Sequence, residues 1–183
     1  MELEIFEFII NNLHNSVLNQ VMQIVTHVGG IPIWLTIAFV LFFFKEYRCS
    51  SLTLVAAVGG SGFICRIVLK PLFARERPFD ALGFELFTRA PTSYSFPSTH
   101  TAMAIAAALV LFTVNRRLGA AALVLALLVG FSRVYLLVHY VSDVLAGIAV
   151  GALVAILAIV IIRRLWEFAE KLWPLYKTNF NRV

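Results

Sequence analysis

Three short polar segments interrupt an otherwise apolar sequence, and their residue types suit the transfer of a phosphoryl group. The segments are Lys70-x6-Arg77-Pro78, Ser95-Phe96-Pro97-Ser98-Thr99-His100 and Ser132-Arg133-x5-His139-x3-Asp143. Histidines, arginines, a lysine and a carboxylate are costly to place beside hydrocarbon, so ionisable groups in such surroundings are functional candidates by default. The three segments therefore predict a reactive, anion-binding site in a membrane protein.

Two histidines and one aspartate are the candidates for the reacting groups. His139 and Asp143 are four residues apart, which places them on one helical face if a helix begins near His139. A carboxylate that accepts a hydrogen bond from one ring nitrogen leaves the other nitrogen free to act as nucleophile or base. An isolated pair of this kind also fits two groups that merely satisfy each other. Beside the other segments, we interpret His139 as the oriented group and His100 as the proton donor to a leaving group.

The cations of the same segments predict a site for phosphoryl oxygens. Lys70, Arg77 and Arg133 would supply forked guanidinium donors and an added ammonium charge. Ser98 precedes a predicted helix, where it would either cap the helix or donate to a phosphate oxygen. The remaining charges of the loop, Arg75, Glu76 and Arg89, are expected to be solvated or to pair within the loop.

A metal centre fits the sequence less well. The four histidines include no His-x3-His pair, and Asp143 stands almost alone as an acidic ligand near the site. The neighbouring cations would also repel a metal ion. We therefore expect no metal and no other cofactor, with charge stabilised by arginine, lysine and helix amides.

The elements that position these segments are expected to be membrane helices. The chain has 183 residues, of which 61% are hydrophobic and 14% charged, whereas soluble domains are roughly half apolar and about a quarter charged. Its length fits one domain over residues 1–183, an all-α polytopic bundle of about five helices of roughly 20 residues each. The expected spans are 31–44 with help from 21–28, then 52–69, 101–114, 118–138 and 144–162.

Details of the apolar stretches add three expectations. Gly29, Gly30 and Pro32 predict a break or re-entrant corner in the first span. The segment MELEIFEFII reads as an amphipathic helix that lies in the membrane interface. Gly147-x3-Gly151 would let helices approach closely, or would mark a dimer face. The oligomeric state stays open.

Basic residues predict which side of the membrane the site faces. Nine of the fifteen fall in short segments on one side of the expected spans, and the positive-inside rule assigns that side to the cytoplasm. They are Lys45, Arg48, Arg116, Arg117, Arg163, Arg164, Lys171, Lys177 and Arg182. All three polar segments then meet on the opposite face, where an anionic ligand explains the exceptional cations. The net charge of +5 is thus accounted for without nucleic acid as a partner.

At these residues the sequence resembles the type-2 phosphatidic acid phosphatase superfamily. That family has the signatures K-x6-RP, PSGH and SR-x5-H-x3-D, which Lys70–Pro78, Pro97–His100 and Ser132–Asp143 match in order. The departure is Thr99, which stands where the family usually has glycine. A β-branched residue does not easily take positive φ, so ordinary helix-start geometry is expected there. Because only the amide of Thr99 is needed to bind phosphate, we expect activity to be retained.

The resemblance implies a mechanism that requires no metal. His139 would attack phosphorus to form a phosphohistidine, with Asp143 orienting it, and His100 would protonate the leaving oxygen and then help activate water. Lys70, Arg77, Ser98 and Arg133 would hold the phosphoryl oxygens. Phosphoryl transfer needs mainly such electrostatic positioning.

Substrate and location follow partly from the resemblance. If the chain is bacterial, the family points to undecaprenyl pyrophosphate, phosphatidylglycerol phosphate or the 1-phosphate of lipid A, with the site at the outer face of the inner (cytoplasmic) membrane, toward the periplasm or cell exterior. The compact form looks like small undecaprenyl pyrophosphate or lipid A 1-phosphate phosphatases. Loop 79–96 carries aromatic residues suited to lipid tails, a head group or interface anchoring: Phe79, Phe84, Phe87, Tyr94 and Phe96. The alternatives are a vanadium-dependent haloperoxidase, disfavoured by the apolar spans, and a non-catalytic lipid-binding or lipid-transport protein.

Overall fold

The computed structural model describes residues 2–84, 86 and 90–180, with 173–180 described by backbone alone, and this part consists of helices joined by turns and short loops. Phe87 and Arg89 lie outside these ranges. In chain order the elements are α1 (Glu2–Asn12), α2 (Ser16–Val28), α3 (Ile31–Phe42), the 3-10 turn η1 (Lys45–Tyr47), α4 (Arg48–Phe63), the π-helical stretch η2 (Ile64–Leu69), α5 (Lys70–Phe73), α6 (Pro78–Leu82), α7 (Thr99–Val114), α8 (Arg116–Tyr135) and α9 (Val141–Phe180). The described residues contain no strand, which confirms the all-α class.

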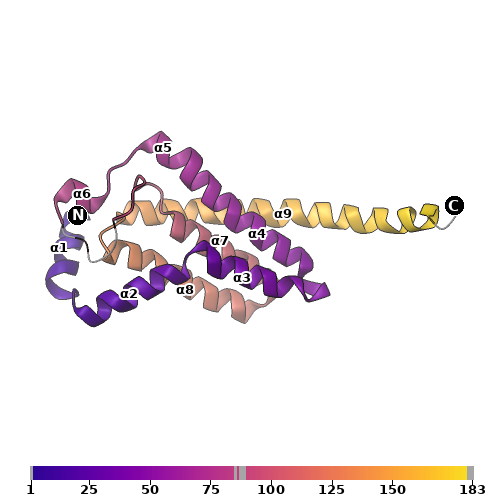
Figure 1. Cartoon of the computed structure of the whole chain (residues 1–183), viewed down its shortest axis with the longest axis horizontal. Helices are drawn as coiled ribbons and strands as arrows, with labels where there is room; N and C mark the ends of the chain where they lie inside the picture. The colour runs from indigo at the N-terminus through magenta and orange to yellow at the C-terminus, as the bar shows by residue number, and fades with distance from the viewer. Residues whose placement is uncertain (1, 85, 87–89, 181–183) are drawn as a thin grey trace.

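Helix α7 forms the centre of the bundle. Helices α4, α8 and α9 pack around it, while α2 lies against α8 and α3 lies against α4 (Figure 1). The buried face of α7 is rich in alanine, which lets neighbouring backbones come close. Helices α7 and α8 form a hairpin joined by Asn115, whose side chain accepts hydrogen bonds from the backbone of Arg117 and Leu118. This hairpin brings the first turn of α7 and the last turn of α8 to the same end of the bundle.

Helix α9 approaches α7 closely through two glycines. A Cβ atom on Gly147 would lie 2.6 Å from the carbonyl oxygen of Ser98, and one on Gly151 would lie 2.2 Å from that of Ala102. Both distances are too short for any side chain. The Gly147-x3-Gly151 pair therefore serves helix packing inside the chain, one of its two expected roles.

The number of membrane spans is confirmed in part. In the described part of the chain, three helical stretches are long and apolar enough to cross a membrane, namely 45–82, 116–135 and 141–172. Helices α2 and α3 together would form a fourth, broken span with a bend of 47°, which confirms the break expected at Gly29, Gly30 and Pro32. Helix α7 is apolar but has only 16 residues. Its place as a fifth span, and hence the total of five, stays a prediction.

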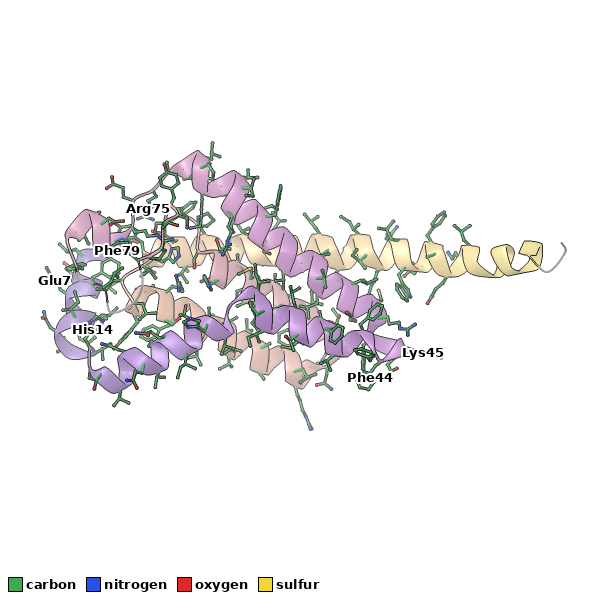
Figure 2. All side chains as sticks on the ribbon, viewed as in Figure 1. Glu7, His14, Phe44, Lys45, Arg75 and Phe79 are labelled. Carbon is green, nitrogen blue, oxygen red and sulfur yellow. The ribbon has the colours of Figure 1, made fainter. Side chains whose placement is uncertain are left out.

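The N-terminal helix α1 packs against the protein as well as presenting an exposed face. Phe6 and Ile9 are buried against residues 134–138, where α8 ends and the chain turns toward α9. The exposed Glu7 lies at the same end of the molecule as Arg75 and Phe79, opposite Phe44 and Lys45 (Figure 2). The helix itself is present as expected, and its position in a membrane interface remains a prediction.

Candidate active site

The three polar segments meet at one end of the bundle, around a cavity of about 110 Å³ that we call the inner cavity. The segments are contributed by α5 and the link to α6, by the start of α7, and by the corner between α8 and α9. Six of the eight site residues predicted from the sequence line the inner cavity: Lys70, Arg77, Thr99, His100, Arg133 and His139. The cavity is of a size for one small anionic group, and its wall is dominated by cations.

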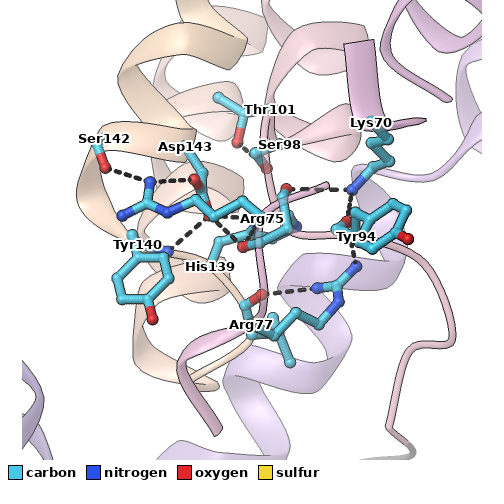
Figure 3. A network of polar contacts seen from close by, with 12 residues as sticks. Lys70, Arg75, Arg77, Tyr94, Ser98, Thr101, His139, Tyr140, Ser142 and Asp143 are labelled. Carbon is cyan, nitrogen blue, oxygen red and sulfur yellow. Dashed lines mark hydrogen bonds and ion pairs between the residues drawn. The ribbon is translucent and has the colours of Figure 1, made fainter. Parts of the chain in front are cut away.

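His139 is held by Asp143 in the geometry that the four-residue spacing predicted. Nδ1 of His139 lies 3.2 Å from Oδ2 of Asp143 (Figure 3). Oδ2 also accepts hydrogen bonds from the hydroxyl of Ser95 and, at 2.9 Å, from the backbone amide of Tyr140. Both His139 and Asp143 are buried. With Nδ1 engaged, Nε2 is the ring nitrogen available to a ligand in the inner cavity, as a nucleophile requires.

The chain reaches this arrangement through a tight corner rather than a longer helix. Helix α9 begins at Val141, so His139 precedes it by two residues. Leu137 has a φ of +58°, a left-handed conformation that costs a non-glycine residue about 1 kcal/mol. This backbone turn exposes the carbonyl of Val138, which accepts a hydrogen bond of 2.7 Å from Arg77. Strain of this kind commonly accompanies functional sites.

The surroundings of His139 favour its neutral form. Burial lowers the pKa of His139 well below the ordinary value, and the positive charges of Arg133, Arg77 and Lys70 lower this pKa further. A neutral imidazole has the free lone pair that attack on phosphorus needs. The site therefore keeps its candidate nucleophile ready at neutral pH.

This pKa shift predicts how activity depends on pH. His139 is active when unprotonated, and its lowered pKa moves protonation to more acidic solution, so kcat/KM should not fall with the ordinary histidine pKa of about 6.5. We expect the acidic limb of kcat/KM, measured from pH 4.5 to 9 with a substrate of constant ionisation, to lie below pH 6. A limb centred at 6.5 or above would contradict the proposed environment of His139.

Arg133 keeps several free donors beside the inner cavity. Its Nη1 donates to Oγ1 of Thr26 on α2 at 2.6 Å, whereas its buried Nε has no hydrogen-bond partner within the described residues. Oγ1 of Thr99 is likewise buried without a partner there, and both side chains line the inner cavity. Buried donors without partners are costly. An anion in the inner cavity would satisfy them.

Lys70 and Arg77 are preorganised by backbone carbonyls. Lys70 donates to the carbonyl oxygens of Tyr94 and, at 3.1 Å, Ser95. Arg77 donates from Nε to Ser93 at 2.6 Å and from Nη2 to Tyr94 at 3.2 Å. An ammonium has three donor hydrogens and a guanidinium five, so each side chain keeps a donor for phosphate. Their orientation is fixed before a ligand arrives.

The first turn of α7 shows a mixed outcome for the predicted residues. Thr99 begins the helix without positive φ, which is the ordinary helix-start geometry expected for it. His100 lines the inner cavity, and its ring makes no hydrogen bond among the described residues. Ser98 is buried with its hydroxyl 2.9 Å from that of Thr101, makes no side-chain cap, and does not line the inner cavity. Contact between Ser98 and phosphate stays a prediction that requires rotation of its hydroxyl.

Sequence reasoning missed three residues that surround the site. Arg75 was expected to be solvated or to pair within its loop; instead it donates to Oδ1 of Asp143 at 2.7 Å. Ser95 bonds Asp143, and Thr26 bonds Arg133. Ser95 is the first residue of the second polar segment, so its position in the sequence could have marked it as a site residue. Thr26 lies on a separate apolar helix, and nothing in the sequence near it indicated a contact with Arg133. Among the described residues no three His, Cys, Asp or Glu side chains gather as a metal site would need.

Comparison with known proteins identifies the family. The chain matches the PAP2 superfamily over residues 50–167. It is 28% identical to the undecaprenyl-diphosphatase BcrC of Bacillus subtilis, covering 100% of this chain and 95% of that protein. It is 35% identical to a lipid A 1-phosphatase of Rhizobium johnstonii over 66% of this chain and 52% of that protein.

A solved structure agrees with this match. The transmembrane PAP2-type phosphatidylglycerolphosphate phosphatase from Bacillus subtilis superposes with a TM-score of 0.72 at 28% identity, covering 92% of this chain and 84% of that one. The match over residues 50–167 includes the cations, both histidines and the aspartate of the site described above. The chain therefore belongs to the PAP2 superfamily and is a multi-pass membrane lipid phosphatase.

Proposed function

We propose that the protein hydrolyses a polyprenyl diphosphate at the outer face of the cytoplasmic membrane, through a phosphohistidine and without a metal ion. The observation that carries this proposal is the His139–Asp143 pair facing a small cavity lined by Lys70, Arg77 and Arg133. An oriented nucleophile with fixed positive charges is what phosphoryl transfer needs.

The reaction would proceed in two steps at His139. In the first, Nε2 attacks the terminal phosphorus, the bond from phosphorus to the leaving oxygen breaks, and His100 gives its proton to that oxygen. In the second, His100 takes a proton from water, whose oxygen attacks the phosphohistidine and releases inorganic phosphate with the imidazole regenerated. Arg133, Arg77 and Lys70 would stabilise the charge on the equatorial oxygens in both steps.

A second cavity supports a diphosphate as the substrate. This outer cavity, of about 500 Å³, shares Arg66, Lys70, Arg77, Pro91 and Ser93 with the inner cavity. The inner cavity would receive the phosphoryl group that is transferred, and the outer cavity the phosphate that stays on the lipid. The match to an undecaprenyl-diphosphatase over the full chain supports the same choice.

Arg66 is the residue expected to recognise the second phosphate. It lines both cavities, and it makes no hydrogen bond or ion pair among the described residues. We predict that Arg66→Gln lowers kcat/KM about tenfold more for farnesyl diphosphate than for farnesyl monophosphate, because a hydrogen bond to a charged group contributes about 1.5–3 kcal/mol. Phosphate release from both short-chain substrates in detergent measures this selectivity.

The control for this prediction is Arg48→Gln, which makes the same change at the first residue of α4, whereas Arg66 lies in η2 beyond the other end of that helix. It should leave the ratio of the two kcat/KM values unchanged. Equal losses on the two substrates in Arg66→Gln would contradict a role in recognising the second phosphate.

The orientation in the membrane is proposed from the distribution of charge. Lys45, Arg48, Arg116 and Arg117 line neither cavity and lie in η1 and in the first turns of α4 and α8, and positive charge at such positions favours the cytoplasmic side. Labelling of single cysteines introduced at Glu7 and Arg117 with a membrane-impermeant maleimide in intact cells tests this. Only the cysteine at position 7 should react.

The decisive test of the whole proposal is phosphate release by the purified protein in excess chelator. The substrates are undecaprenyl diphosphate, phosphatidylglycerol phosphate and lipid A. Fastest release from the diphosphate supports the proposal, and fastest release from lipid A or phosphatidylglycerol phosphate reassigns the substrate. Release from none of them would favour the alternative of a lipid-binding or lipid-transport protein, and loss on chelation would overturn the metal-free reaction.

A further inference from the structure

Arg75 connects the N-terminal helix to the carboxylate behind His139. Its Nη1 donates at 2.7 Å both to Oδ1 of Asp143 and to the hydroxyl of Ser142. Its Nη2 pairs with Oε2 of Glu2 on α1 at 3.2 Å. Figure 3 shows Arg75 lying across Ser142 and Asp143 at the start of α9. One guanidinium therefore joins the first residue of α1 to the first turn of α9.

Glu2 also holds the start of α9 directly. Its Oε1 accepts hydrogen bonds from the hydroxyl of Ser142 at 2.7 Å and from the backbone amide of Ser142 at 3.2 Å. An acidic side chain at a helix N-terminus satisfies a free amide and interacts favourably with the helix dipole. Glu2 thus fixes the turn that carries Asp143.

Aromatic contacts fix the same arrangement from another side. The guanidinium of Arg75 lies 3.8 Å from the centre of the Tyr140 ring. That ring is 5.7 Å from the buried ring of Phe6 on α1. Polar and apolar contacts of α1 therefore converge on the residues that flank His139 in the sequence.

The carboxylate of Asp143 depends on Arg75 for one of its two oxygens. Oδ2 is engaged by His139, Ser95 and Tyr140, whereas Oδ1 accepts its hydrogen bond from Arg75 at 2.7 Å. Asp143 is fully buried, and a buried anionic oxygen that loses its donor is strongly disfavoured. Without Arg75 the carboxylate would turn toward another donor and release His139.

We infer that Arg75 is a positioning residue for the His139–Asp143 pair, and that α1 acts through Glu2 as a part of the active site. This inference rests on the proposed reaction at His139. Neither residue needs to touch substrate for it: Glu2 lines neither cavity, and Arg75 lines only the outer one. Helix α1, which lies at the edge of the bundle, would thereby affect the chemical step.

Steady-state kinetics on farnesyl diphosphate test the inference. Arg75→Met should lower kcat roughly 10–100-fold, the scale found when second-layer partners of reactive groups are lost, with KM changed less than about twofold. Glu2→Gln should lower kcat by a smaller factor. The double variant should lose less kcat than the product of the two single losses, because two residues in one network are not additive.

Matched variants distinguish an effect on the geometry of the His139–Asp143 pair from a general loss of protein stability. Glu7→Gln makes the same change at an exposed position of α1 and should behave as wild type. Arg75→Ala should regain kcat when guanidinium is added at millimolar concentration, which repair of a folding defect would not explain. A raised KM at unchanged kcat would overturn the inference in favour of substrate binding, and wild-type kinetics in both Arg75→Met and Glu2→Gln would overturn it outright.

A readout that does not depend on turnover distinguishes failure of this inference from failure of the proposed function. Nitrogen NMR of labelled histidine should show His139 in wild type as one tautomer, protonated at Nδ1, and a mixture in Arg75→Met and Glu2→Gln. An unchanged tautomer in both variants would contradict the inference even if the wild type hydrolysed none of the lipids. A mixture with an inactive wild type would contradict only the reaction.

Discussion

Replacement of His139 by alanine is expected to reduce phosphate release at least about 10⁴-fold, the scale on which removal of a nucleophile acts. The reason is the geometry at Asp143: the carboxylate holds Nδ1 at 3.2 Å and thereby leaves Nε2 to meet the phosphorus. Among the described residues, His100 is the one other histidine that lines the inner cavity, and it has the separate role of proton donor in the proposed reaction. The measurement is phosphate release in chelator, with thermal unfolding in detergent to show that the variant is folded.

The control for this experiment is His27→Ala. His27 is an exposed histidine of α2 whose Nδ1 lies 2.6 Å from the backbone carbonyl of Gln23, and its loss should leave turnover unchanged. Retained turnover in His139→Ala would exclude the phosphohistidine. Retained cellular function without turnover would revive the reading as a lipid-binding or transport protein.

The second large effect concerns His100. Its replacement by glutamine should slow formation of the phosphohistidine and its hydrolysis to different extents, depending on the leaving group. General acid catalysis contributes about 10²–10⁴-fold, and it matters most when the leaving oxygen is a poor one. With farnesyl monophosphate, whose leaving alkoxide must be protonated, His100→Gln should lower kcat by about this factor. With p-nitrophenyl phosphate, whose leaving group needs no proton, attack by His139 should survive, so that phosphohistidine accumulates because water is no longer activated.

Rapid quenching with radiolabelled substrate detects this intermediate. A phosphohistidine survives base and is lost in acid, unlike a phosphoserine, and the burst should approach one phosphate per active site. His27→Gln serves as the matched control and should show no accumulation. Equal losses on both substrates, with no trapped phosphate, would exclude His100 as the group that protonates the leaving oxygen and activates water.

The reactive core of the site was predictable because short-range spacing determines it. His139 and Asp143 are four residues apart, and their hydrogen bond follows from that distance once a helix begins nearby. The meeting of the three polar segments also followed from counting apolar spans, since alternate loops lie on alternate sides. Cations that violate the positive-inside pattern then indicated an anion site.

The residues that support His139 and Asp143 were not predictable, because their contacts join residues that are far apart in the sequence. Arg75 and Asp143 are separated by 68 residues, and Glu2 and Ser142 by 140. An acidic first turn is equally typical of a helix that lies in the membrane interface. The burial of Phe6 and Ile9 in the structure shows that α1 packs on the protein near the site. Likewise, sequence gives no sign that Lys70 bonds the carbonyls of Tyr94 and Ser95.

The span count was difficult for a physical reason that α7 makes clear. Hydropathy identifies segments that face lipid, whereas α7 is packed among α4, α8 and α9 and buries 11 of its 16 residues. A helix shielded by its neighbours is free to be short and rich in alanine. Its 16 residues are therefore hard to identify as a membrane span from hydropathy, although the helix lies at the centre of the bundle.

The two glycines of α9 set a length on which the chemistry depends. Gly147 contacts the carbonyl that begins α7, and Gly151 contacts that helix one turn further on. His100 lies in α7, and His139 precedes α9 by two residues. In the proposed reaction these two side chains would act on opposite sides of one phosphorus atom. Their separation would then be set by how closely α9 packs against α7, and therefore by two positions that have no Cβ atom.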